Sequence, residues 1–180
     1  MTPRWVADAL LAAAAGAVLS GAPSTLIALC SGADALGAAR AAGALIGRPT
    51  LTRGALVHAA VSAGWGLSMA AVWSRRPRQG ALGGAASGAC AGVLMAALDL
   101  ELVARLLPVL LSRCGAPGAS RLGGQLERRV GPVAALPQLG QWLDHVCFGA
   151  VTGAVLGARA AARGCGHDDR TGGRPASPAG

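Results

Sequence analysis

The sequence has little charge and few aromatic side chains, and these absences exclude whole classes of protein. Of its 180 residues only 13% are charged and 3% are aromatic, with one Phe and neither Tyr, Lys nor Asn. A soluble domain carries about 25% charged residues, so the composition argues against an ordinary soluble domain. With so few rings, the chain cannot assemble a large aromatic core.

The absence of lysine also bears on how the basic net charge of the chain is interpreted. The net charge is +8, and all 16 basic residues are Arg. Ala, Gly, Pro and Arg have GC-rich codons, whereas the absent or rare residue types have AT-rich ones. A GC-rich bacterial genome therefore accounts for the arginines without phosphate recognition. Because the arginines flank apolar blocks, as membrane topology requires, we expect no nucleic-acid partner.

The sequence contains no pattern typical of a metal centre or an active site. Its five cysteines form no C-x-x-C pair and have no zinc spacing. No phosphate loop, nucleophile elbow or H-E-x-x-H sequence is present. A haem held between two helical histidines is an alternative, but bulky side chains to wall such a pocket are scarce. We therefore expect no metal, no cofactor and no enzymatic activity.

What the chain does have is long apolar blocks. Hydrophobic residues make up 53% of it, and they fall in runs of about 20 residues, the length that an α-helix needs to cross a bilayer. The sequence therefore predicts an all-α, polytopic membrane bundle of four transmembrane helices plus one or two interfacial helices. The predicted spans are residues 5–22, 54–73, 81–98 and 139–158.

The segments between these spans are more polar. Leu26 to Ile46 carries Asp34 and Arg40, which favours an interfacial or partly re-entrant helix that ends at Gly47-Arg48-Pro49. Residues 99–112 are predicted to form a surface helix with Glu101 and Arg105 paired at i,i+4. We expect a loop outside the membrane at 113–131. The membrane domain, 1–163, is then followed by a disordered tail, 164–180.

Two glycine ladders lie in the third and fourth predicted spans. Small residues four apart leave a smooth groove on one side of a helix, so that a second backbone can approach closely, which is a main source of helix association in lipid. In a chain so rich in Ala and Gly this spacing also arises by chance. The ladders consist of Gly84, Gly88 and Gly92, and of Gly149, Gly153 and Gly157.

Four ionisable residues form a candidate polar cluster. His58 lies early in the second span, Asp99 closes the third, and Asp144 and His145 open the fourth. With four alternating spans, all of them lie near the membrane face opposite the termini. Asp99 and His145 also lie within about 40° of the glycine ladder on their own helix. We predict that His58 and His145 contact Asp99 or Asp144 across the bundle.

A purely structural interpretation of the same residues stays open. Interfacial Asp and His side chains commonly cap helices or bond to neighbouring backbone groups. Asp144 falls where a carboxylate in the first turn of a helix favours the helix dipole. Ionisable groups within a membrane are nevertheless candidates for function.

Four strings of the sequence carry a resemblance to a known group of proteins. They are GAPST (21–25), HAAVSAGWG (58–66), LDL (98–100) and PQLGQWLDHVCFGAVTGAVLG (137–157). Together they resemble small actinobacterial multi-pass membrane proteins with no assigned activity. The resemblance covers most of the chain except 113–131 and the tail. It implies a membrane location and the same polar cluster, and it supplies no substrate, cofactor or catalytic residue.

The expected location is the bacterial plasma membrane, with the lipid bilayer as the first partner. Four spans put both termini on one side, and eight arginines fall on each side, so the arginine count alone does not orient the chain. The compact Arg75-Arg76-Pro77-Arg78 turn favours cytoplasmic termini.

The expected role is non-enzymatic and acts through helix packing, as a homo-oligomer or as a subunit of a larger membrane assembly. The alternative is a transporter or channel component in which His58, Asp99, Asp144 and His145 couple to a proton or a ligand.

Overall fold

The computed structural model describes residues 3–74, 80–114 and 118–168, and its elements are all helices within those ranges. The prediction of an all-α protein is therefore confirmed. The elements are α1 (Arg4–Ser20), α2 (Ala22–Cys30), α3 (Gly37–Gly43), the 3-10 helix η1 (Ala44–Ile46), α4 (Leu51–Trp73), α5 (Gly80–Ala96), the π-helix η2 (Ala97–Leu106), α6 (Leu107–Arg113), α7 (Ala119–Ala134) and α8 (Gln138–Asp168).

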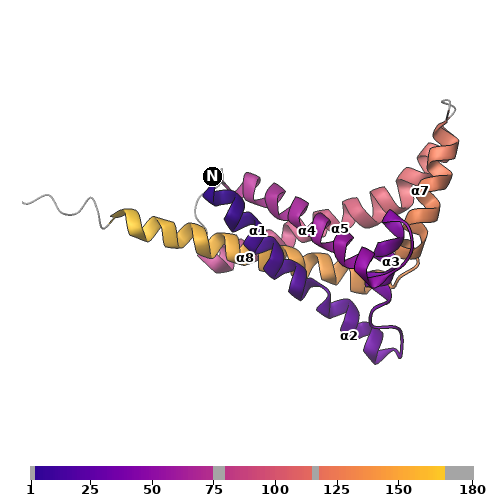
Figure 1. The fold of residues 1–180 in the computed structure, drawn as a ribbon. Helices are drawn as coiled ribbons and strands as arrows, with labels where there is room; N and C mark the ends of the chain where they lie inside the picture. Colours follow the sequence, from indigo (N-terminus) through magenta and orange to yellow (C-terminus); the bar gives the residue numbers. More distant parts are fainter. Residues whose placement is uncertain (1–2, 75–79, 115–117, 169–180) are drawn as a thin grey trace, which may run out of the picture.

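Four of these helices form the bundle (Figure 1). α8 packs against α5 along one side and against α1 along another, and α1 also packs against α4. Neighbours in each of these pairs run in opposite directions, so the start of α1 and the end of α8 lie at the same end of the bundle. At the opposite end, α2, α3 and the α6–α7 pair extend beyond the four rods.

Three helical segments are long and apolar enough to cross a membrane: Arg4–Cys30, Leu51–Trp73 and Gln138–Arg163. This number is smaller than the four that the sequence predicted. The difference lies in the predicted span 81–98, where the regular α-helix α5 has only 17 residues. At 1.5 Å per residue that is about 26 Å, which is short of the roughly 30 Å of hydrocarbon.

After α5 the chain continues as a π-helix rather than as a regular surface helix. The predicted pair of Glu101 and Arg105 is present, with 3.1 Å between Arg105 Nη1 and Glu101 Oε2. Pro108 donates no hydrogen bond, and in a regular α-helix its ring would clash with the carbonyl of Ala104. The wider π turns directly before Pro108 avoid this clash.

The segment between Leu26 and Ile46, expected to form one interfacial helix, is instead divided among the end of α2, α3 and η1. α2 continues the first span to Cys30, after a break at Gly21 and a restart at Pro23. A turn with Gly32 at a φ of +68° then leads into α3 and η1. The helix does end at Gly47, as predicted, because the φ of +141° there is one that only glycine adopts readily.

Two predictions for the polar segments are wrong. Residues 119–131, expected in a loop, belong to α7; the abundance of Arg and Gly hid an apolar period at Leu122, Leu126, Val130 and Val133. Residues 164–168, expected in the disordered tail, continue α8. The remainder of the predicted tail lies outside the described residues.

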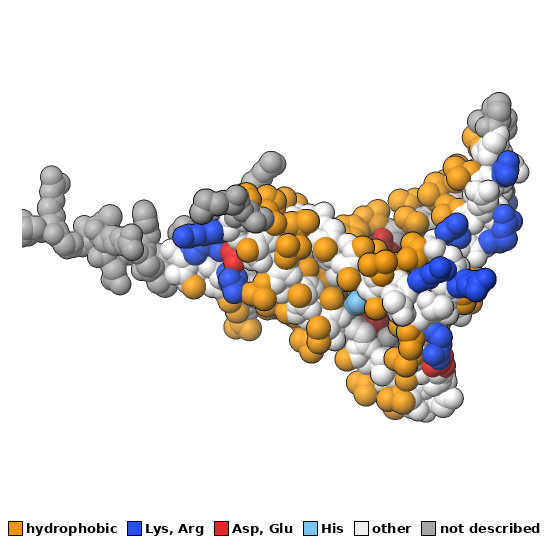
Figure 2. All heavy atoms as spheres, viewed as in Figure 1, with side chains coloured by type: hydrophobic (Ala, Val, Ile, Leu, Met, Phe, Trp, Pro, Cys, Tyr) orange, Lys and Arg blue, Asp and Glu red, His pale blue; other side chains and the backbone are white. Residues whose placement is uncertain are grey.

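Many small side chains lie in the interior of the bundle, beside a few large ones such as Met95 and Phe148, whereas many large apolar side chains face outward. The most buried apolar residues include Ala9, Ala12 and Ala96, with no exposed surface at all. In contrast, Leu82 and Val18 are 88% and 81% exposed. Figure 2 shows apolar side chains over the length of the bundle and charged ones gathered at its two ends.

The two glycine ladders lie against each other. This is the close helix packing that their spacing predicted. A Cβ added at any of the six glycines would overlap a backbone carbonyl oxygen of the facing helix. Such overlaps leave no room for a side chain, so α5 and α8 are in direct backbone contact. The facing positions are Gly84 with Gly153, Gly88 with Gly149, Gly92 with His145, and Gly157 with Gly80.

Candidate functional site

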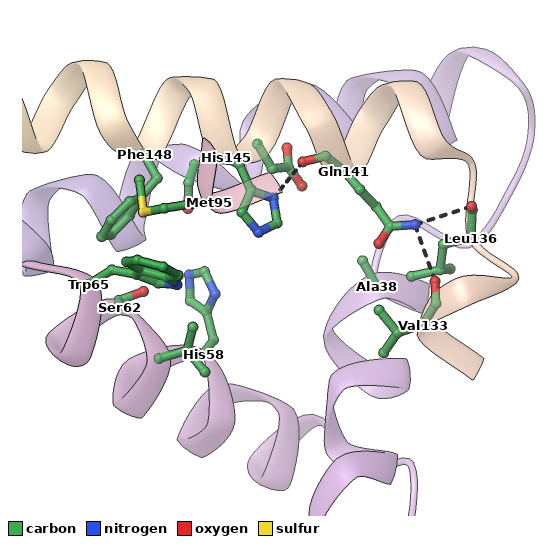
Figure 3. Close-up of a pocket in the computed structure, with 14 residues that line it drawn as sticks. Ala38, His58, Ser62, Trp65, Met95, Val133, Leu136, Gln141, His145 and Phe148 are labelled. Atoms are coloured by element: carbon green, nitrogen blue, oxygen red, sulfur yellow. Dashed lines mark hydrogen bonds between the residues drawn. The ribbon is translucent and has the colours of Figure 1, made fainter. Parts of the chain in front are cut away.

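A cavity of about 160 Å³ lies at the end of the bundle away from the termini. Three of the four predicted cluster residues line it: His58, Asp144 and His145. Figure 3 shows the rings of His58, from α4, and His145, from α8, pointing toward one another across this cavity. Apolar side chains close it on one side, where Trp65 and Phe148 lie.

The glycine ladders fix the position of the polar residues. Gly92 rests against the backbone of His145, so the backbone contact between α5 and α8 extends to that residue. Asp99 follows Gly92 by seven residues and lies at the start of the π-helix η2, which continues directly from α5. The close approach thus puts the Asp99 carboxylate within reach of the His145 ring.

His145 lies between two hydrogen-bond acceptors. Its Nδ1 is 2.8 Å from the carbonyl oxygen of Gln141, and its Nε2 is 3.2 Å from Asp99 Oδ2. A carbonyl only accepts, so Nδ1 carries a hydrogen. Nε2 then either donates to the ionised Asp99, as part of an imidazolium, or accepts from the protonated carboxyl. In both cases the pair holds one proton more than a neutral ring beside a carboxylate.

Trp65 belongs to the same group, although the sequence did not indicate it. Its indole Nε1 donates to Asp99 Oδ2 at 3.2 Å. One carboxylate oxygen therefore meets both the indole of α4 and the imidazole of α8, and Asp99 links three helices of the bundle. The prediction that His145 contacts Asp99 is confirmed. A Trp placed mid-span could have been recognised as a donor, since a buried indole N–H usually finds a partner.

Asp144, which belongs to α8, hydrogen-bonds to the start of α2. Its Oδ1 accepts a hydrogen bond of 2.9 Å from the backbone N–H of Ser24, the third residue of α2. No side chain caps the start of α2 locally, and a carboxylate at a helix N-terminus satisfies a free N–H and favours the dipole. Because α8 begins at Gln138, the interpretation of Asp144 as a first-turn residue of its own helix is wrong.

His58 does not contact either aspartate, so that part of the predicted cluster is wrong. Its Nε2 is instead 3.0 Å from the carbonyl oxygen of Ala17 in α1. Because the N–H of Gly21 turns toward Leu19 at the end of α1, the Ala17 carbonyl is open to side-chain donors. Ser20 Oγ and the His58 ring both approach it.

At the other end of the bundle, Asp8 is 6% exposed and lies between two arginines of α8. Arg159 Nη1 is 2.6 Å from Asp8 Oδ1, and Arg163 bonds to the second carboxylate oxygen. The two arginines are four residues apart and share one side of α8, a spacing that could have indicated a common acidic partner.

No protein-family model, curated protein or solved structure matches this chain. The resemblance to small actinobacterial membrane proteins therefore stays a prediction, and the chemistry of the site follows from its own side chains. Among the side chains that the structure describes, which end at Arg163, no three His, Cys, Asp or Glu residues are placed to hold a metal ion. The groups that line the cavity can hold a proton and can donate or accept hydrogen bonds to a small polar solute.

Proposed function

We propose that this protein is a small multi-pass protein of the bacterial plasma membrane that acts through helix packing, as a homo-oligomer or as a subunit of a larger assembly. The distribution of side chains carries this proposal. Small residues fill the interior while large apolar ones such as Leu82, Val18 and Leu94 face outward. Water disfavours so large an apolar exterior, whereas lipid solvates it and rewards close packing of small residues.

The ion pair between α1 and α8 supports four crossings rather than three. Asp8 and Arg159 join the start of the first candidate span to the end of the last. If both ends lie at one membrane surface, the chain crosses the bilayer an even number of times. α5, which runs along α8 through the glycine ladders, supplies the fourth crossing, and its π-helical continuation supplies the missing length.

One side of α4 is available for a partner helix. Gly66 and Ser62 face α1 and are buried, whereas Ala60, Gly64 and Ser68 lie on the opposite side and are exposed. A Cβ added at Gly64 would meet no atom within 4 Å. Small residues four apart on an open side allow a second helix to approach closely.

The mass of the protein in a mild detergent tests this role. Light scattering behind size exclusion is expected to give an oligomer or a complex with a co-purified membrane protein. A Gly64→Leu variant is expected to reduce it to a monomer. Gly131→Leu, another glycine with open space around it but located on α7, is the matched control. A chain that is monomeric without any partner, or monodisperse in buffer without an amphiphile, would contradict the proposal.

A second candidate function is coupling to a proton or a small solute, and the polar cavity favours it. The cavity is lined by His58, Asp144 and His145, and His145 Nε2 lies 3.2 Å from Asp99 Oδ2. Groups of this kind mark ion and solute paths in membrane proteins.

Flux measurements in proteoliposomes test the second candidate. A pH gradient across the vesicle is expected to drive proton movement that is lost in His145→Gln and in Asp144→Asn. Asp34→Asn, which changes an exposed aspartate outside the cavity, is the control and is expected to keep the flux. Absence of flux in the unmodified protein would remove this candidate while leaving the packing role intact.

A further inference from the structure

α6 and α7, which we call the arm, carry arginines that have no acidic partner. Arg121, Arg128 and Arg129 of α7 are all exposed. Among the described residues no carboxylate lies within ion-pair distance of any of them. Arg121 and Arg128 are seven residues apart and therefore lie about 20° apart around the helix. α7 contains one acidic residue, Glu127, so this side of the arm is strongly positive.

The arm also exposes large apolar side chains. Gly123 rests against the backbone of α6 at Pro108 and Ser112, so the two helices of the arm pack tightly on each other. Their remaining apolar surface is open. Exposed apolar residues of the arm and of the π-helix before it are Leu102, Val103, Leu106, Val109, Leu110 and Leu122.

The two kinds of side chain lie on different sides of the arm. The arm leaves the bundle at a steep angle at the end opposite the termini (Figure 1). Figure 2 shows its apolar side chains toward the long apolar surface of the bundle and its arginines along the outer edge. A helix pair at the surface of a bilayer has this arrangement, with apolar groups in the acyl boundary and basic groups at the headgroups.

We infer that the arm is a docking surface for anionic phospholipids, whose headgroup phosphates are bound by the arginines of α7. The inference rests on the membrane location proposed above. A guanidinium matches two phosphate oxygens at once, and a membrane surface rich in anionic lipid attracts basic residues next to it. Arg121 and Arg128 carry the recognition. Arg129 has a second role, since its Nη1 donates to the carbonyl of Leu45 and ties α7 to η1 at 2.8 Å.

Lipid selectivity of the full-length protein tests the inference. The protein is held in neutral detergent with equal amounts of phosphatidylglycerol and phosphatidylcholine, and native mass spectrometry counts the lipids that stay bound. A preference for phosphatidylglycerol is expected. Each arginine at an anionic surface contributes about a fivefold preference, so R121Q/R128Q is expected to lower the preference by between about five- and twenty-fivefold.

Two controls separate this site from a general effect of charge. R121K/R128K keeps the charge but loses the two-pronged guanidinium contact, and it is expected to keep part of the preference, more than R121Q/R128Q keeps. Arg4→Gln removes one charge at the other end of the bundle and is expected to change nothing, whereas Arg128→Gln alone lowers the preference. Thermal unfolding in phosphatidylcholine alone verifies that each variant is folded.

Three results would overturn the inference. They are an unmodified protein without lipid preference, a folded R121Q/R128Q variant that keeps it, and an equal loss in Arg4→Gln. Binding that millimolar inorganic phosphate abolishes would assign the arginines to a soluble phosphate ligand instead. Each of these can occur in a protein that is firmly embedded in the membrane, so a failure here is distinct from a failure of the membrane location.

Discussion

At the scale of single residues, the hydrogen bonds of His145 set the chemistry of the cavity. The ring lies between the carbonyl of Gln141 and the carboxylate of Asp99, both within 3.2 Å. Two acceptors on one imidazole require a proton that a neutral ring beside an ionised aspartate does not have. The indole of Trp65 lies on the same carboxylate oxygen, and it therefore reports whether that proton is present.

The first prediction uses this reporter. The emission of Trp65, obtained as the difference between the unmodified protein and a Trp65→Phe variant, is expected to change in a single step as the His145 ring gains or loses its proton. The step is expected to vanish in His145→Gln, because Gln can hydrogen-bond but cannot titrate.

His58→Gln is the matched control for this titration. His58 bonds to the Ala17 carbonyl of α1 and not to Asp99, so the step is expected to remain. A pH response that persists unchanged in His145→Gln would show that the proton is held by another group.

Asp8 carries the second prediction. The side chain is buried and accepts hydrogen bonds from Arg159 and Arg163, so Asp8→Asn removes the counter-charge of both arginines. A lost charge-assisted hydrogen bond at a buried site costs about 1–3 kcal/mol, and the midpoint of thermal unfolding in detergent is expected to fall accordingly.

Asp34 is the control for Asp8, because it also pairs with an arginine but is half exposed. The hydrogen bond from Arg40 lowers the pKa of Asp34. Its small stabilising effect is therefore complete at neutral pH and is lost only as the pH falls below the ordinary range of an aspartate. Asp34→Asn is expected to shift the midpoint far less than Asp8→Asn; an equal shift would mean that Asp8 does not clamp the bundle.

At the scale of elements, the contact between α5 and α8 carries the third prediction. Gly88 and Gly149 rest directly on each other's carbonyl groups. Gly88→Ile would force the backbones apart, and overpacking of this kind costs about 3 kcal/mol or more. Gly131→Ile, on α7 with no atom within 4 Å of an added Cβ, is expected to leave the stability nearly unchanged. Thermal unfolding of both variants in one detergent compares them directly, and equal midpoints would refute the ladder contact.

A second substitution at Gly88 tests the link between the ladder and the cavity. Separating α5 from α8 moves Asp99 away from His145, so any folded Gly88→Ala protein is expected to show a weaker Trp65 titration than the unmodified chain. A milder substitution is suited to this measurement, because the side chain of alanine demands less separation than that of isoleucine.

The elements also show what sequence spacing can and cannot predict. The ladders and the approach of Asp99 to His145 could be predicted, because residues four or seven apart on a helix share a side whatever the rest of the chain does. The hydrogen-bond partner of His58 could not be predicted, because it depends on the break of α1 at Gly21. The partners of Asp8 could not either, because they depend on which helices become neighbours.

α7 shows a different limit. Its Arg and Gly content is typical of a loop, and its apolar positions are few. It is nevertheless a helix, for two reasons. Gly123 lets it pack closely on α6. At the end of α7, Nε2 of Gln141 in α8 donates hydrogen bonds of 3.1 Å to the carbonyls of Val133 and Leu136. These are tertiary contacts, and local propensity gives no sign of them.

At the scale of the whole molecule, the bundle has basic groups at both ends and apolar side chains along the length between them (Figure 2). Its composition predicted this arrangement. The length of each helix had to come from the structure, since α5 is only 17 residues long and the first span continues to Cys30.

The number of crossings is the last prediction. If α5 crosses with the other three rods, residues near the start of α1 and near the end of α8 lie at one surface, and the arm lies at the other. Single-cysteine proteins in sealed vesicles test this with a maleimide that does not cross lipid. Arg4→Cys and Ala162→Cys, both at exposed positions, are expected to react from the same side, and the native Cys114 at the end of α6 from the opposite side.

Three crossings would give the reverse pattern for the two engineered cysteines. The start of α1 and the end of α8 would then be separated by the full thickness of the bilayer, about 30 Å of hydrocarbon. Asp8 could not reach Arg159 across that distance, so the ion pair and an odd number of crossings exclude each other. Labelling of Arg4→Cys and Ala162→Cys from opposite sides would therefore refute the bundle as a whole, including the cavity that its far end encloses.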